Sequence, residues 1–95
     1  MNDTISRDQP QHRDPVTLAL VVLAWLLGDP QRADRLLSLS GMTADQLREG
    51  AFQPSVLAEI LRYLEGHEPD LIAAAGAAHV SAAQLVDARK ELDRM

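Results

Sequence analysis

Residues 14–30 read DPVTLALVVLAWLLGDP, and this stretch decides the fold class. Asp14 can cap the free amides of a helix start, and Pro15 suits the first helical position because its missing amide costs nothing there. The twelve residues before Gly28 are interrupted by one polar residue, Thr17. Gly28 can end the helix by taking the left-handed conformation after the last turn. We therefore predict a long apolar helix between the two Asp-Pro pairs.

This helix is apolar on nearly every side, which is typical of a helix in the middle of a core. Trp25 continues the face formed by Leu18 and Val22, and we predict that its ring is buried at the centre of the fold. The twelve-residue run is shorter than the roughly 20 residues of a membrane span. It also lacks the flanks of a signal peptide, so we expect a cytoplasmic protein.

Two shorter helices are predicted next along the chain. An Asp-Pro pair at residues 29–30 repeats the start signal, and Gly41 closes the helix that it opens. Thr43 with Gln46 three residues later is a capping box, in which each side chain satisfies a backbone amide near the other. A third helix should therefore cover residues 44–49.

The second half of the chain has the same start and stop signals. Apolar residues at helical spacing after Pro54 predict a fourth helix that ends at Gly66. A fifth, alanine-rich helix starts at residues 68–69, again with proline. Ser81 with Gln84 forms a second capping box and starts the sixth helix.

The two halves align when residues 16–50 are shifted by 38 positions. The six identical pairs are Leu23 with Leu61, Leu26 with Leu64, Gly28 with Gly66, Ala44 with Ala82, Gln46 with Gln84 and Leu47 with Leu85. Two interpretations stay open: an approximate two-fold arrangement of two three-helix units, or convergent use of the same helix signals.

Composition sets the size and class of the protein. The chain has 95 residues and a mass of 10.4 kDa, with 46% hydrophobic and 24% charged residues, so it makes one domain at most. Residues 1–13 are mostly polar and are predicted to form a flexible tail, whereas residues 14–95 are predicted to form a single helical domain. The expected fold is all-α, a compact bundle of five to six short helices.

Short motifs across the chain resemble the bacterial domain-of-unknown-function family 3572. They are Gly28-Asp29-Pro30, Ser40-Gly41-Met42 with Leu47-Arg48, Val56-Leu57 with Leu61-Tyr63-Leu64, and Glu68 with Leu71. The resemblance covers roughly Val16 to Arg89, and the family pattern suggests a glycine where this chain has His79. The resemblance implies no activity, cofactor or catalytic residue, because the family has none established.

Residue types that carry chemistry are sparse. His67, Glu68 and Asp70 cluster between two helices, but zinc sites need three or four ligands at fixed spacing, and a solvated loop is the simpler interpretation. The serines fit capping better than a catalytic triad. Trp25, Phe52 and Tyr63 are interpreted as core residues. We predict no catalytic, cofactor-binding or metal-ligating residue, and no enzyme.

Helix-turn-helix DNA binding is the main alternative function. The apolar spacing around both capping boxes fits that motif. The first candidate recognition helix offers only Arg48, however, and the bases of the second lie near its far end at residues 89–94, among acids. A net charge of −5 also disfavours binding to a polyanion.

The remaining interpretation of the function is a small acidic helical module without catalytic activity. It would contact an unknown protein partner or form a homo-oligomer, with no metal, no membrane and no nucleic acid. The small side chains of residues 73–78 suit close packing between helices.

Overall fold

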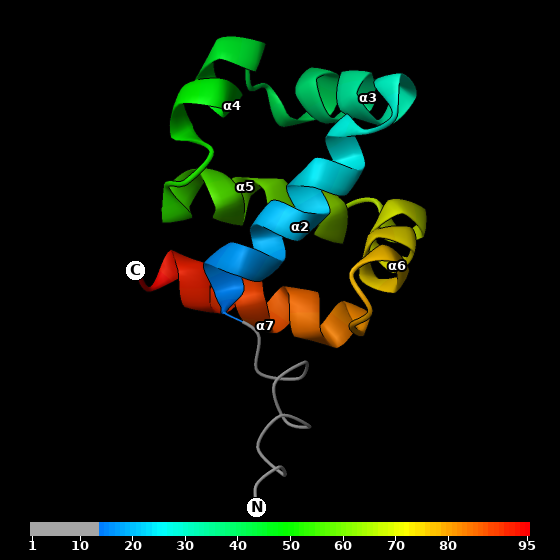
Figure 1. Ribbon diagram of the computed structural model, residues 1–95, viewed down its shortest axis with the longest axis vertical. Helices are drawn as coiled ribbons and strands as arrows, with labels where there is room; N and C mark the ends of the chain where they lie inside the picture. Colours follow the sequence, from blue (N-terminus) through cyan, green and yellow to red (C-terminus); the bar gives the residue numbers. More distant parts are fainter. Residues whose placement is uncertain (1–13) are drawn as a thin grey trace, which may run out of the picture.

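The computed structural model describes residues 14–95, which form six helices and no strand (Figure 1). The helices are α2 (Pro15–Leu27), α3 (Pro30–Ser40), α4 (Ala44–Gly50), α5 (Pro54–Glu65), α6 (Glu68–Ala77) and α7 (Ala82–Asp93). The predicted all-α bundle is therefore confirmed. The tail predicted over residues 1–13 lies outside the described residues.

Helix α2 is central in the arrangement and packs against α3, α5, α6 and α7. In Figure 1 it crosses in front of α5, with α3 and α4 beyond one of its ends and α7 beside the other. The most extensive packing joins α5 to α7, and α4 makes the least contact with the other helices.

The helix starts predicted at the two Asp-Pro pairs are confirmed by their hydrogen bonds. The Asp14 carboxylate accepts from the Thr17 amide at 3.0 Å, and the Asp29 carboxylate accepts from the Gln31 amide at 2.8 Å. In each case the next residue is a proline at the first helical position. These aspartates satisfy amides that the helix itself leaves free.

Both capping boxes form as predicted. The Thr43 hydroxyl accepts from the Gln46 amide at 3.0 Å, and the Gln46 side-chain oxygen accepts from the Thr43 amide at 2.9 Å. The corresponding distances for Ser81 and Gln84 are 3.1 and 2.8 Å. The two caps start α4 and α7 at positions that differ by 38 residues.

The predicted left-handed glycine at the end of α2 is wrong. Gly28 has φ −74°, and its amide donates to the carbonyls of Ala24 and Trp25, which closes the last turn in the right-handed conformation. Gly41, at the end of α3, does take the left-handed conformation with φ 80°.

The end of α6 has a left-handed residue that is not glycine. His79 has φ 61°, the one positive value among the described non-glycine residues. The His79 amide donates to Gly76 at 3.2 Å and the Val80 amide donates to Ala75 at 3.0 Å, which is the Schellman pattern of a helix end. Position 79 is also 38 residues after Gly41, and the family pattern suggests glycine there. The two halves thus share their left-handed turn as well as their capping box.

The buried core comes mainly from α2, α5 and α7. Its largest fully buried side chains are Val22, Leu26, Leu36, Leu57, Ile60, Leu61, Leu64, Leu85 and Leu92. Helix α6 contributes only alanines to it. Alanines allow α6 to approach closely but remove little apolar area from water.

The predicted burial of Trp25 at the centre of the fold is wrong. The buried face of α2 runs through Val22, Leu23 and Leu26, one position away from Trp25, which is only partly buried. The chain bends by 114° between α2 and α3, and the Arg32 guanidinium lies 3.9 Å from the centre of the indole ring. A cation over the ring face is favourable, so Arg32 covers one side of a partly buried ring that packs against the core from outside.

Among the described residues, no single helix has the length and apolar character of a membrane span. The pairs α2–α3 and α6–α7 meet that test only when joined, and they are bent by 114° and 94°.

Candidate interaction groove

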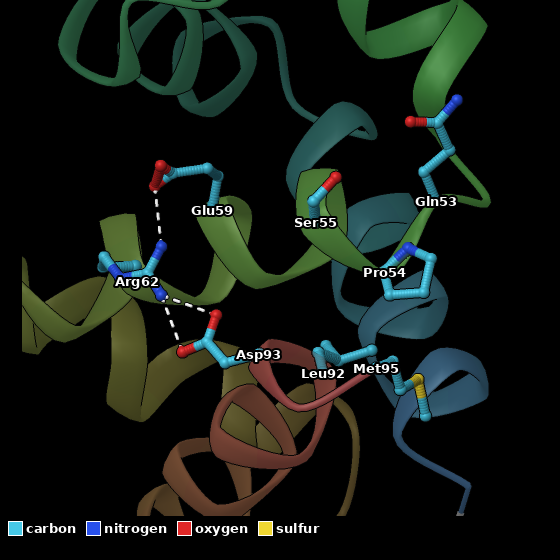
Figure 2. Close-up of a pocket in the computed structure, with 8 residues that line it drawn as sticks. All are labelled: Gln53, Pro54, Ser55, Glu59, Arg62, Leu92, Asp93 and Met95. Carbon is cyan, nitrogen blue, oxygen red and sulfur yellow. Dashed lines mark hydrogen bonds and ion pairs between the residues drawn. The ribbon is translucent and has the colours of Figure 1, made fainter.

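The exposed side of α5 is bordered by two open depressions. The first, of about 530 Å³, lies between α5 and the end of α7 (Figure 2). Its lining consists of Gln53, Pro54, Ser55, Glu59, Arg62, Leu92, Asp93 and Met95. The second, of about 430 Å³, lies between α4 and α5. Its lining consists of Met42, Gln46, Glu49, Gly50, Gln53, Ser55, Val56 and Glu59. Because three residues line both, the two form one surface, which we call the α5 groove.

A glycine sets the close approach of α4 to α5 beneath the groove. Gly50, the last residue of α4, is buried, and a Cβ atom there would lie 2.7 Å from Cγ2 of Val56. Real Cβ contacts are longer, so any larger residue would force the Val56 side chain or the end of α4 to move. The glycine therefore allows the end of α4 to lie directly against Val56.

The floor of the groove is apolar. Met42 and Val56 are partly buried against the core at the α4 end. At the other end Leu92 is almost fully buried, whereas Met95 is 63% exposed. In Figure 2 the side chains of Pro54, Leu92 and Met95 lie near one another, opposite the ion pairs.

One arginine joins α5 to α7 at the edge of the groove. The Arg62 guanidinium donates to both Asp93 carboxylate oxygens at 2.7 Å and to Glu59 at 3.0 Å (Figure 2). Asp93 also accepts from Arg89 at 3.0 Å, and Arg89 makes a bidentate pair with Glu65 at 2.7 and 3.1 Å. The network holds the most extensively packed pair of helices together.

These hydrogen bonds change the protonation of the groups that make them. The bonds from Arg62 and then Arg89 lower the pKa of the Asp93 carboxyl below its ordinary value of 3.8. The bonds to Asp93 and Glu59 raise the pKa of Arg62. The bonds between Arg62 and Asp93 favour the charged form of both groups, so this pair stays charged at neutral pH.

The charge of the groove lining is acidic. Glu49, Glu59 and Asp93 face a single base, Arg62, which is already bound by two carboxylates. Glu49 is exposed and takes part in no ion pair within residues 14–95.

Phe52 is exposed beside the groove, and the prediction that it belongs to the core is wrong. Its side chain is 76% exposed, whereas Tyr63 is buried as predicted. Phe52 lies in the turn between α4 and α5, next to Gln53 of the groove, so it is not on a helical face that points inward. The groove was not predicted from the sequence, although the apolar residues Phe52 and Val56 flank the start of α5 and were a usable signal.

The histidine–acid cluster between α5 and α6 separates into two structural contacts. His67 Nδ1 lies 2.8 Å from the Tyr63 carbonyl, and its ring packs on the Tyr63 ring. Asp70 accepts two hydrogen bonds from Arg35 at 3.1 and 3.2 Å, which tie α3 to α6. Residues 14–95 contain no group of three His, Cys, Asp or Glu side chains placed to hold a metal ion.

Three of the serines, Ser40, Ser55 and Ser81, make structural contacts or line the groove. The Ser40 hydroxyl accepts from the Met42 amide at 3.2 Å, and Ser81 caps α7. Ser55 lines the α5 groove.

Most basic side chains are held by acids. Residues 14–95 contain seven Lys and Arg residues, and five of them form ion pairs: Arg32, Arg35, Arg48, Arg62 and Arg89. They include Arg48, which the helix-turn-helix alternative needs for contact with DNA and which pairs with Asp45 at 2.6 Å. The 94° bend between α6 and α7 does fall in the range of that motif.

The fold of residues 14–95 defines the class of this chain: a small all-helical protein in which six helices share one buried core. The chain belongs to the family described as protein of unknown function (DUF3572), whose model matches residues 12–94. No curated protein and no solved structure matches the chain.

Proposed function

We propose that this protein is a non-catalytic interaction module of the cytoplasm that docks another protein on its α5 side. The observation that carries the proposal is the exposure of Phe52, 76%, in the α4–α5 turn directly before Gln53 of the α5 groove. Aromatic side chains are enriched at the centres of protein interfaces, where they supply much of the binding energy. A water-exposed phenylalanine gains nothing for the fold of the isolated chain.

The α5 groove provides a hollowed surface for such a contact. Its apolar floor removes area from water when it is covered, and its polar edge can form hydrogen bonds that set orientation. Docking of this kind needs no catalytic group.

The test compares two exposed apolar residues on different sides of the molecule. Tagged wild-type protein, Phe52→Ala and Ile72→Ala would be purified from the native cell, and bound proteins would be quantified. Ile72 is 58% exposed on α6 and does not line the groove, so it is the matched control. Loss of the Phe52 ring should weaken binding by roughly tenfold, since it removes about 1–2 kcal/mol of apolar burial.

Two results would contradict the proposal. A wild-type protein that retains no partner and stays monomeric at all concentrations would show that it is not an interaction module. Retention that depends on Ile72 but not on Phe52 would move the interface to α6.

Duplex binding tests the helix-turn-helix alternative. A DNA-binding protein should bind unrelated duplex at low salt and weaken steeply as salt rises, because phosphate contacts release counterions. We expect no such binding in fluorescence anisotropy, since five of the seven described basic side chains are held by acids. Tight, salt-sensitive binding would favour α7 as a recognition helix.

A further inference from the structure

We propose that the α5 groove binds a basic amphipathic helix of a partner protein. This inference rests on the proposed function and deepens it, because it names the kind of protein segment that the module would hold.

The two depressions place apolar side chains on both flanks of α5. Apolar side chains occur at both ends, with Met42 and Val56 near α4 and with Leu92 and Met95 near α7. The groove runs across α5 from one end to the other, and the polar residues Ser55 and Glu59 of α5 lie between its apolar ends. An amphipathic helix laid across α5 presents apolar residues on one face at i, i+3 or i+4, and i+7, and keeps its polar face in water.

The edge of the groove selects the charge of the ligand. Glu49, Glu59 and Asp93 lie around the apolar floor, and the one arginine there is already bound to two of these carboxylates. A lysine or arginine of the ligand would meet Glu49 without first breaking an ion pair within residues 14–95. Charge complementarity of this kind steers encounter and excludes acidic partners.

A second copy of this chain is a poor ligand for the same groove. The ligand needs a helix whose polar face is basic, whereas five of the seven described basic side chains are already paired with acids. Helix α7 carries Arg89 and Lys90, but Asp87, Glu91 and Asp93 share its surface. We therefore assign the groove to a different protein.

The test uses a labelled helical peptide of about four turns with leucines on one face and lysines elsewhere. Fluorescence anisotropy would compare wild-type protein with Glu49→Lys and with Asp34→Lys. Both variants change the net charge equally, but Asp34 is exposed on α3 and lines neither depression. Glu49→Lys should weaken binding by roughly fivefold to tenfold, and Asp34→Lys by less than about twofold.

A peptide of the same composition with its leucines scattered around the helix is the control for non-specific attraction. It should bind weakly, and amide chemical-shift changes from the amphipathic peptide should concentrate at Met42, Val56 and Leu92. Equal weakening by the two charge reversals, or equal binding of both peptides, would overturn the proposed ligand.

The same variants separate this inference from the proposed function. If Glu49→Lys leaves retention of the native partner unchanged while Phe52→Ala abolishes it, the chain is an interaction module whose groove does not hold a basic helix. If neither variant changes retention, both proposals fail.

Discussion

Replacing His79 with glycine should stabilise the protein. His79 ends α6 with φ 61°, a conformation that costs an L-residue roughly 1–2 kcal/mol because its Cβ crowds the backbone. Glycine has no Cβ but loses more conformational freedom on folding, which costs roughly 0.5–1 kcal/mol. The difference predicts a gain of about 0.5–1 kcal/mol for His79→Gly.

The hydrogen bonds that close this turn remain after the His79→Gly substitution. The bonds that close it, from the amides of His79 and Val80 to carbonyls of α6, are backbone bonds and stay in place. The imidazole is exposed, so its removal leaves no cavity. For a domain of this size the gain corresponds to a rise in Tm of roughly 2–8 °C.

Two variants isolate the backbone effect. His79→Ala removes the imidazole but keeps a Cβ, so it should stay within about 0.5 kcal/mol of the wild type. Gly41→Ala introduces the same conformational cost 38 residues earlier, where φ is 80° and a Cβ would meet no atom within 4 Å. That variant should lose about 1 kcal/mol.

Urea and thermal unfolding followed by circular dichroism measure all three variants. If His79→Ala were destabilising and His79→Gly no better, the imidazole would make a contact that matters and the conformational reasoning would be refuted. If Gly41→Ala left the free energy of unfolding unchanged, the assumed cost of a left-handed alanine would be refuted.

Three further predictions concern the caps, the α4–α5 contact and the ion-pair network. Thr43→Ala or Ser81→Ala should cost about 0.5–2 kcal/mol of unfolding free energy, whereas aspartate at either position should be tolerated because it also caps well. If aspartate were as destabilising as alanine, the hydroxyl would have a role other than capping. Gly50→Ala should lower the free energy of unfolding by about 1–3 kcal/mol through overpacking. Adding Val56→Ala should recover part of that loss, because it removes the atom 2.7 Å from the new Cβ. Purely additive losses of unfolding free energy in a double-mutant cycle would contradict this coupling. The folded-state pKa of Asp93 lies below its ordinary 3.8, so the stabilising effect of its carboxylate is present above that pH and is lost as pH falls through the folded value. The Tm advantage of wild type over Asp93→Asn should thus hold from pH 7 to about 5 and shrink below about 4. An advantage independent of pH would show that titration of Asp93 does not contribute to stability.

Local signals in the sequence determined the helices. Four of the six helix starts in residues 14–95 depend on a side chain within three residues, as the pairs Thr43–Gln46 and Ser81–Gln84 show. Helices α5 and α6 have a proline in their first turn and no side-chain cap bond. Such contacts form wherever the chain is helical, because the partners are close along the sequence. The class of the fold and the order of its helices were therefore predictable from the sequence.

The tertiary structure alone decided which apolar residues the core would leave out. Trp25 and Leu26 are equally apolar neighbours, but the packing of α2 on its neighbours turned Leu26 inward and left Trp25 beneath Arg32. Phe52 became exposed because the α4–α5 turn carries it away from the core. The α5 groove likewise brings together residues far apart in the sequence, such as Gln53 and Met95 in one depression, and this proximity is set by how the helices pack rather than by any local pattern.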